Sequence, residues 1–241
     1  MAATRRPRRE TQAETRRHLL DAAARLFEER GFHGTSVAEI ARAAGYTTGA
    51  IYANFERKED LAMAVLERSV AQAEVALTEV LAVRGDLATR LLAVIRWRRA
   101  QPDLDPFAIL RYELWLLALR DPPLRADLTA AQRRLQTDFA RLLDQQAADL
   151  GASYRVDTGL LAGALLAAAD GTSVAHALDP AGQHQEAYAW ALASLVVNAM
   201  EPPPIDGSDW AALAAALLDT AGDKPVAREG AGGSVPEQAP R

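Results

Sequence analysis

The sequence of 241 residues has no cysteine, only 6% aromatic residues and only two lysines. The lack of cysteine excludes disulfides, iron–sulfur clusters, thiol catalysis and cysteine zinc sites, and with them a disulfide-stapled secreted fold. There is no run of about 20 apolar residues, so no membrane-spanning helix and no membrane partner are predicted. No apolar segment follows the arginines near the N-terminus, which argues against a signal peptide. We therefore expect a cytoplasmic protein.

The composition that is present is typical of a folded helical protein. Hydrophobic residues make up 49% and charged residues 24%, which is too apolar for a disordered chain. Ala, Leu, Arg and Glu are abundant, and no useful stretch alternates with period two, so an all-α fold is predicted. Helix-breaking segments predict nine or ten helices, with breaks at 31–35, 45–47, 56–57, 84–86, 101–105, 121–123, 151–153, 179–182 and 201–208.

Charge is unevenly distributed along the chain. The net charge is -5, but residues 1–60 hold 11 basic and 9 acidic residues (net +2), which leaves 16 and 23 (net -7) for the rest. This asymmetry indicates an anion-binding N-terminal part. Four segments are expected: a disordered basic arm (1–10), a small helical domain (11–60), a larger helical domain (61–221) and a Gly- and Pro-rich disordered tail (222–241).

Residues 11–60 are predicted to form a helix-turn-helix. The first helix ends at Gly31, and a capping box of Ser36 and Glu39 begins the second. Gly45 ends that helix, and Thr47 is the N-cap of a short third helix. Two short helices joined by a glycine-containing turn and packed on a longer one are characteristic of this motif. The residues expected to face inward are Leu19, Leu20, Ala23, Leu26, Phe27, Val37, Ile40, Ala41, Ala44, Ile51 and Phe55.

The outward face of the third helix suits a DNA major groove. Its residues are small or hydrogen-bonding, none is acidic, and Gly49 lets the backbone approach closely. Tyr52 and the threonines can bond phosphates, and the N-terminus of the second helix attracts phosphate. Only Asn54 offers a bidentate base reader, so shape recognition is expected to contribute. The predicted DNA-binding residues are Thr35, Ser36, Thr47, Thr48, Gly49, Ala50, Tyr52, Ala53, Asn54, Arg57 and Lys58.

Residues 35–61, TSVAEIARAAGYTTGAIYANFERKEDL, resemble the DNA-binding signature of the TetR family of transcriptional regulators. The resemblance implies that the third helix is the recognition helix and that Lys58 touches the phosphate backbone. Arg57 departs from the Ser or Asn cap that is frequent in the family, and it could add a phosphate contact instead. Whether the arginine arm enters a minor groove or stays solvated is open. The matching positions are Thr35, Ile40, Ala41, Ala44, Gly45, Thr47, Gly49, Tyr52, Phe55, Lys58 and Leu61.

The second domain contains a stripe of small residues at spacing four. Such a stripe lets another helix approach closely, either within the chain or from a second copy. The resemblance places the dimer interface on the last two long helices, so 156–178 and 184–199 are predicted to form a four-helix homodimer interface. Two half-sites of an operator require such a dimer. The predicted interface residues are Gly159, Gly163, Ala167, Gly171, Ala175, Trp190 and Leu195.

Aromatic and arginine residues cluster around a helix predicted at 106–119. A central apolar helix with a few polar groups fits a ligand pocket, although aromatic residues at helical spacing are also typical of a plain core. The resemblance implies a small-molecule effector. The predicted ligand-binding residues are Trp97, Phe107, Arg111, Tyr112, Trp115 and Phe139. No catalytic residue, cofactor or metal site is predicted, because no catalytic constellation occurs and His176 and His184 lack a metal-ligand spacing.

Together these features predict a homodimeric repressor that binds a palindromic operator on double-stranded DNA and is released by a small-molecule effector. Two alternatives stay open. One is a DNA-binding regulator that is an activator or is controlled by a protein partner. The other is a helical adaptor or enzyme with an incidental helix-turn-helix.

Overall fold

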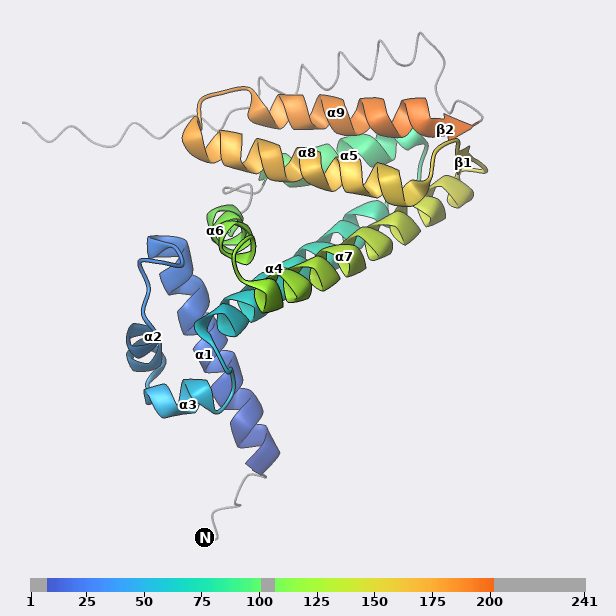
Figure 1. Ribbon diagram of the computed structural model, residues 1–241. Helices are drawn as coiled ribbons and strands as arrows, with labels where there is room; N and C mark the ends of the chain where they lie inside the picture. The colour runs from blue at the N-terminus through green and yellow to red at the C-terminus, as the bar shows by residue number, and fades with distance from the viewer. Residues whose placement is uncertain (1–7, 101–106, 202–241) are drawn as a thin grey trace, which may run out of the picture.

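The protein is helical, as the sequence predicts. The computed structural model describes residues 8–100 and 107–201, which fold into nine α-helices and one two-stranded ladder (Figure 1). In the ladder, β1 (Ser153–Tyr154) pairs antiparallel with β2 (Met200–Glu201), which is too short to leave an alternating pattern in the sequence. The helices are α1 (Arg8–Arg30), α2 (Val37–Ala44), α3 (Thr48–Tyr52), α4 (Lys58–Leu81), α5 (Leu87–Ala100), α6 (Ala108–Ala118), α7 (Pro122–Asp149), α8 (Thr158–Leu178) and α9 (His184–Ala199).

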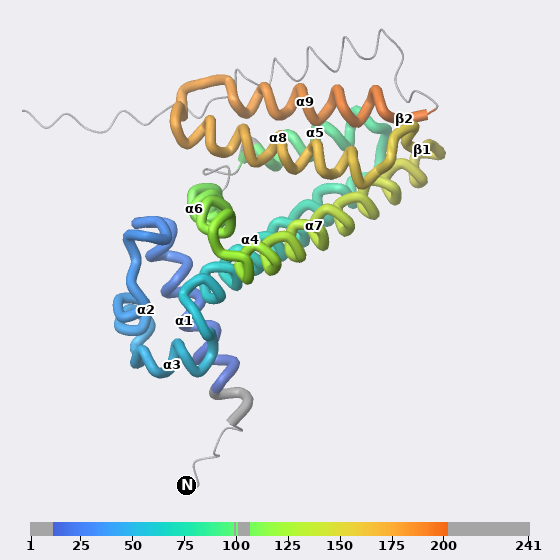
Figure 2. The backbone as a smooth tube through the Cα atoms, in the orientation of Figure 1, coloured from blue at the N-terminus to red at the C-terminus, as the bar shows by residue number. Residues whose placement is uncertain are grey.

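The helices fall into two groups at opposite ends of the molecule (Figures 1 and 2). The first three helices form one end, and α8 and α9 lie side by side at the other. Helices α4 and α7 pack together and run between the two ends. Helix α6 lies where the two groups meet. The long helices therefore connect the helix-turn-helix physically to the rest of the fold.

The bounds of two helices bear on the predicted segment boundaries. Helix α1 begins at Arg8, so residues 8–10 are helical and do not belong to a disordered arm. Helix α4 begins at Lys58 and crosses the predicted boundary at residue 60. The rest of the predicted arm, the break at 101–105, most of the break at 201–208 and the tail at 222–241 lie outside the described residues.

Two hydrophobic cores hold the described residues together. The first contains residues from α1 to α3, the start of α4, and also Leu110, Leu114 and Leu124 from α6 and α7. The second is built from α5, the end of α7, α8 and α9, with Met200 fully buried. The helix-turn-helix therefore shares its core with the helices that follow α4.

Helix α8 departs from the expectation that no helix could span a membrane. Its 21 residues, with a mean hydropathy of 1.3 over the most apolar window, satisfy the length and composition of such a helix, and 22% of that window is buried. An apolar helix in a core or at a subunit interface meets the same criteria. Asp170, within this helix, forms an ion pair with Arg111 of α6.

Candidate DNA-binding surface and effector cavity

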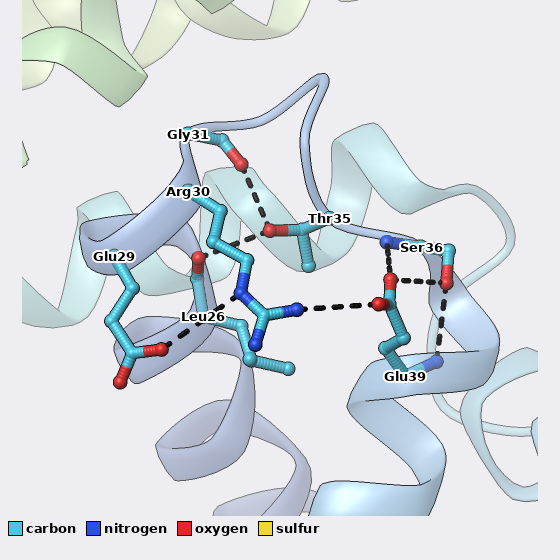
Figure 3. Close-up of polar contacts among 7 residues, drawn as sticks. All are labelled: Leu26, Glu29, Arg30, Gly31, Thr35, Ser36 and Glu39. Atoms are coloured by element: carbon cyan, nitrogen blue, oxygen red, sulfur yellow. Dashed lines mark hydrogen bonds and ion pairs between the residues drawn. The ribbon is translucent and has the colours of Figure 1, made fainter.

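A complete capping box begins α2, as predicted (Figure 3). The Ser36 Oγ accepts a hydrogen bond from the Glu39 amide at 3.2 Å, and the Ser36 amide donates to the Glu39 carboxylate at 2.9 Å. The Ser36 hydroxyl donates to the same carboxylate at 2.6 Å. Hydrogen bonds from the Ser36 side chain and backbone lower the pKa of Glu39. Arg30, 3.2 Å from the Glu39 carboxylate, ties the end of α1 to this cap.

The burial of Thr35, beside this cap, argues against the predicted contact of its side chain with DNA. Its side chain is only 2% exposed. The hydroxyl points back into the protein and donates to the carbonyls of Leu26 and Gly31, at 3.0 and 2.9 Å (Figure 3). Thr35 therefore bonds one carbonyl in the last turns of α1 and the carbonyl of Gly31, the residue that follows this helix.

Gly45 sets the angle between α2 and α3. It adopts the left-handed conformation (φ 78°, ψ 25°), which glycine reaches without a steric penalty. The Tyr46 amide then donates to the Ala41 carbonyl at 2.8 Å, and the Tyr46 hydroxyl lies 3.0 Å from His18 Nδ1 on α1. Tyr46 therefore holds the turn to α2 through its amide and to α1 through its hydroxyl.

The short helix α3 presents the predicted surface to solvent. Ile51 (0% exposed) and Phe55 (4%) anchor it in the core, as expected. Thr47 is the N-cap, but its side chain caps no amide. A methyl group added at Gly49 would touch only the Thr47 hydroxyl oxygen, at 3.6 Å, so space in front of the backbone is open. The exposed residues on this surface are Thr47, Thr48, Gly49, Tyr52 and Ala53, while Ala50 is half-buried.

Asn54, the predicted base reader, is engaged within the protein. Its side-chain amide donates to the Ala50 carbonyl of its own helix at 2.8 Å. Its backbone carbonyl accepts from Arg16 of α1 at 3.2 Å, and the Arg16 guanidinium lies 4.2 Å from the centre of the Phe55 ring. Arg16 therefore stands at the end of α3 and adds a positive charge there. The prediction missed it because 38 residues separate Arg16 from Asn54.

The two basic residues that begin α4 also bind protein groups. The Arg57 guanidinium faces three carboxylates, those of Asp60 (3.0 Å), Asp121 (3.6 Å) and Asp127 (3.8 Å). The Lys58 ammonium donates to the Phe32 carbonyl, and burial lowers its pKa. These contacts join α4 to α7 and to the turn before α2. The predicted phosphate contacts of Arg57 and Lys58 stay predictions, and they require these groups to be shared or released.

Helix α6 contacts the helix-turn-helix directly. The Phe32 amide, in the turn after α1, donates to the Glu113 carboxylate at 2.6 Å. The carbonyl of the same residue accepts from Lys58, whose ammonium also lies 4.0 Å from the centre of the Phe32 ring. One residue of the turn is therefore held by both α4 and α6. This contact could not be predicted from the sequence, because 81 positions separate Phe32 from Glu113.

A cavity of about 460 Å³, called here the central cavity, lies between helices α4 to α9. Its volume is within the range of small-molecule sites. An adjoining hollow of about 270 Å³ continues from it between α4, α6, α7 and α8. The central cavity is lined mainly by apolar side chains, among them Val70, Leu77, Leu135, Leu142, Leu165 and Leu166.

Three of the six predicted ligand-binding residues, Trp97, Arg111 and Phe139, line the central cavity. Trp115 lines the adjoining hollow together with Arg111. Phe107 and Tyr112 line neither. Phe107 packs against the first core, and the Tyr112 ring lies 5.1 Å from that of Trp115.

The polar wall of the central cavity was not predicted as a group. Arg111 and Asp170 form an ion pair at 2.7 Å, with side chains less than a fifth exposed. Arg98 donates to the Ser173 hydroxyl at 3.1 Å, and its guanidinium lies 5.3 Å from the centre of the Tyr188 ring. These residues come from α5, α6, α8 and α9, so no local sequence pattern could bring them together.

The stripe of small residues on α8 does not form one face. A step of four residues turns an α-helix by about 40° beyond a full circle, so four steps rotate the stripe by about 160°. Accordingly, Gly163 faces Gln136 of α7, whose amide donates to the Gly159 carbonyl at 2.6 Å. Ala167 and Gly171 are exposed, and Ala175 is partly buried. The outward face of α8 is formed by Leu160, Ala164, Ala167, Gly171 and Leu178.

The outer face of α9 carries both predicted anchors. Trp190 is 57% exposed and Leu195 is 39% exposed. Both are large apolar side chains that residues 8–100 and 107–201 leave partly uncovered, and they add to the exposed leucines of α8. The four-helix dimer interface itself stays a prediction.

These features define a class of protein: a helix-turn-helix joined by one continuous helix to a larger all-α domain with an open cavity. Residues 19–65 match the family described as bacterial regulatory proteins, tetR family. This match confirms the resemblance of residues 35–61 to the TetR family.

The curated relatives named here match over short stretches of the chain. The HTH-type transcriptional regulator AcrR of Shigella flexneri is 54% identical over 56 residues, which are 23% of this chain and 26% of AcrR. The HTH-type transcriptional repressor NemR of Escherichia coli is 37% identical over 84 residues, 34% of this chain and 42% of NemR. The chain thus spans less than two thirds of these curated relatives.

Solved structures match over most of the chain. The reduced form of E. coli NemR has a TM-score of 0.62 and 23% identity, and it covers 79% of this chain and 100% of that one. A transcriptional regulator of Saccharomonospora viridis, solved in complex with choline, has a TM-score of 0.60 and 24% identity, with 78% and 99% covered. At this identity the likeness shows the fold of both domains.

Proposed function

We propose that the protein is a transcriptional repressor that binds a palindromic operator as a homodimer and is released by a small-molecule effector. The observation that carries the proposal is the exposed, non-acidic face of α3 on a helix-turn-helix that matches the TetR family. Such a protein acts where the chromosomal DNA is, so we propose a cytoplasmic location. It is not proposed to be an enzyme, and the relatives named above are transcriptional regulators.

The DNA contact is proposed to centre on α3. Tyr52 is 58% exposed, so its hydroxyl is accessible to a phosphate. The threonines at the start of α3 add hydroxyl groups, and Gly49 allows close approach of the backbone. Arg16 contributes a positive charge beside the end of α3, at the end of the molecule that carries the helix-turn-helix (Figure 1).

Dimerisation is proposed through the outer faces of α8 and α9. Exposed side chains as apolar as Leu160 (71%), Leu178 (82%) and Trp190 (57%) need cover in water. Two such helices from each copy form a four-helix bundle. Helices α8 and α9 lie at the opposite end of the molecule from α3 (Figure 1). Dimerisation there leaves the α3 helix of each copy free to enter one of two successive major grooves about 34–36 Å apart.

Release by an effector is proposed to act through α6. Arg111 of this helix lines the cavity, and Glu113, two residues on, holds the Phe32 amide next to α2. A ligand that moves α6 therefore changes the turn that positions the helix-turn-helix. Effector and DNA then weaken each other's binding by the same factor.

The test is selection of duplexes from a random-sequence pool by the purified full-length protein. We expect an inverted-repeat site, bound with an affinity that falls steeply as salt rises because phosphate contacts release counterions. Tyr52→Ala should weaken binding at least tenfold, about 1.4 kcal/mol, and leave the dimer intact. Tyr112→Ala, a tyrosine of α6 that lines neither cavity, is the matched control. No enrichment of any sequence, with no binding at low salt, would contradict the proposal.

The alternatives lead to different outcomes of the same selection. An activator or a regulator controlled by a protein partner still selects an operator, but no small molecule changes its affinity. An adaptor or enzyme with an incidental helix-turn-helix selects no sequence at all.

A further inference from the structure

Arg98 is a partly buried guanidinium that no carboxylate accompanies within the described residues. Its Nε is fully buried and has no hydrogen-bond acceptor. Its neighbours are the Ser173 hydroxyl, at 3.1 Å, and the ring of Tyr188. A buried donor without an acceptor costs free energy, so such a group points to a missing partner.

The Ser173 hydroxyl does not neutralise this charge. Ser173 is buried (4% exposed), and its own hydroxyl proton goes to the Ala169 carbonyl at 2.8 Å. Its oxygen can therefore accept from Arg98 but offers it no negative charge. Tyr188 is likewise neutral, because burial raises the pKa of its phenol.

Among the described residues, the inner wall of the central cavity carries one net positive charge. Arg111 is matched by Asp170 at 2.7 Å, which leaves Arg98 as the excess. The remaining charged lining groups, Glu74, Asp138 and Arg141, are all exposed and mark the open side of the cavity, where Arg141 pairs with Asp138 at 2.6 Å. The excess negative charge there belongs to Glu74 and faces solvent. Charge thus favours an anion inside and water at the mouth.

The rest of the cavity is apolar and aromatic. Trp97, Phe139 and Tyr188 provide ring surfaces, and leucines of α4, α7 and α8 complete the wall. A guanidinium offers Nε–H and Nη–H side by side, which matches the two oxygens of one carboxylate.

We propose that the effector is a monoanionic carboxylate with an apolar or aromatic body, and that Arg98 binds its carboxylate. This inference rests on the proposed function, because it names the class of molecule that the regulator detects. It assigns Arg98 as the residue that selects charge and the aromatic wall as the part that holds the body.

The test uses two matched triplets of probes with the wild-type full-length protein: naphthylacetate, naphthylethanol and naphthylethylammonium, and decanoate, decanol and decylammonium. Within each triplet only the head group differs. We expect the carboxylates to raise the melting temperature and to bind at least tenfold more tightly than the alcohols, with the ammonium compounds weakest. Equal or tighter binding of the alcohols or ammonium compounds, or no shift with either carboxylate at millimolar concentration, overturns the proposal.

Substitutions test Arg98 itself by calorimetry with the better carboxylate. Arg98→Gln should lose about 10- to 100-fold in affinity, since a hydrogen-bonded charge pair contributes about 1.5–3 kcal/mol. Arg96→Gln, two residues earlier on the same helix and exposed, is the matched control and should bind like wild type. If Arg98→Gln does not fold, Arg98→Lys keeps the charge without the fork and should lose a smaller factor. Wild-type affinity in either Arg98 variant overturns the proposal.

Failure of this inference is distinguishable from failure of the proposed function. Operator selection without any ligand tests DNA binding alone. Operator binding that no carboxylate weakens leaves a repressor with another effector, whereas absence of operator binding removes the function itself.

Discussion

At the scale of single residues, Gly49 tests how closely α3 approaches DNA. A methyl group at this position meets only the Thr47 hydroxyl oxygen, at an ordinary contact distance of 3.6 Å. Gly49→Ala should therefore keep or raise thermal stability, because alanine is favoured over glycine in helices by up to about 1 kcal/mol. It should weaken operator binding about tenfold or more, because the methyl group separates backbone and duplex. Melting curves and fluorescence anisotropy measure the two effects.

An unchanged operator affinity of Gly49→Ala, together with a normal fold, would falsify close approach of the α3 backbone.

Thr35 and Thr48, two threonines of the helix-turn-helix, are expected to respond to substitution by valine in opposite ways. Thr35→Val removes a hydroxyl that bonds two carbonyls, so it should lower the free energy of unfolding by about 1 kcal/mol. The operator affinity of the folded protein should not change, because Thr35 is 2% exposed. Thr48→Val, at an exposed position, should leave stability unchanged and weaken operator binding. Urea denaturation measures the stability of both variants, and fluorescence anisotropy measures their operator affinity. If Thr35→Val weakened operator binding and Thr48→Val lowered stability, the roles of the two threonines would be exchanged.

Residue exposure in the helix-turn-helix could be predicted where helical spacing controls it. Ile40, Ile51 and Phe55 are buried as their spacing indicates. The roles of Asn54 and Lys58 could not be predicted, because their partners, Arg16 and Phe32, lie far away in the sequence. Thr35 has nearer partners, but its hydroxyl serves the end of α1 rather than the start of α2. The family motif identifies positions, and only the fold decides which atoms face DNA.

At the scale of elements, the capping box of α2 makes stability depend on pH. The pKa of Glu39 is lowered from 4.5 by its hydrogen bonds with Ser36. A lowered pKa in the folded state stabilises the protein above pH 4.5, and the effect is lost as the pH falls through the folded-state pKa. The stability difference between wild type and Glu39→Gln, measured by urea denaturation, should shrink as the pH is lowered below 4.5.

The matching change on the other side of the box is Ser36→Ala. This substitution should lower the free energy of unfolding by about 1 kcal/mol at neutral pH, as the loss of an N-cap does. A Glu39→Gln effect that is constant from pH 7 to pH 3 contradicts a charged partner in this cap.

Helix α6 is expected to stabilise the turn before α2 through one contact. The Glu113 carboxylate accepts from the Phe32 amide at 2.6 Å. Glu113→Gln replaces a charged acceptor with a neutral one and should lower the free energy of unfolding by about 1 kcal/mol. Glu67→Gln is the control, since its pair with Arg134 is 3.6 Å long and largely exposed and should contribute little. If Glu113→Gln and Glu67→Gln lower the free energy of unfolding equally, the contact of α6 with Phe32 stabilises the protein no more than an exposed ion pair does.

At the scale of the whole molecule, the exposed apolar face of α8 and α9 predicts the oligomeric state. Trp190→Glu places a charge on this face, where Trp190 is 57% exposed, so it should yield a monomer at micromolar concentration. The monomer should lose operator affinity at least tenfold, because one half-site supplies about half of the contacts. Val75→Glu, an equally exposed apolar position on α4 (61%), should stay dimeric. Sedimentation velocity measures both, and a dimeric Trp190→Glu places the interface elsewhere.

Fold class and the nine helices within residues 8–100 and 107–201 could be predicted, because both follow from helix propensity and from breaks that lie within short windows. The polar wall of the central cavity could not, since Arg98 comes from α5, Ser173 from α8 and Tyr188 from α9. The small stripe of α8 was misplaced for a geometric reason: a repeat of four drifts around a helix of 3.6 residues per turn. Gly159 and Gly163 therefore pack within the chain, while Ala167 and Gly171 face outward.

The shared first core has a consequence for grafting. The core that contains Phe27, Ile40 and Ile51 also contains Leu110, Leu114 and Leu124, which belong to α6 and α7. A fragment ending near residue 60 would expose part of that core. A chimera that joins residues 1–60 to another regulator therefore has to include these three leucines together with Glu113. The helix-turn-helix packs against residues that lie more than 40 positions after it in the sequence, so residues 1–60 alone do not carry its complete core.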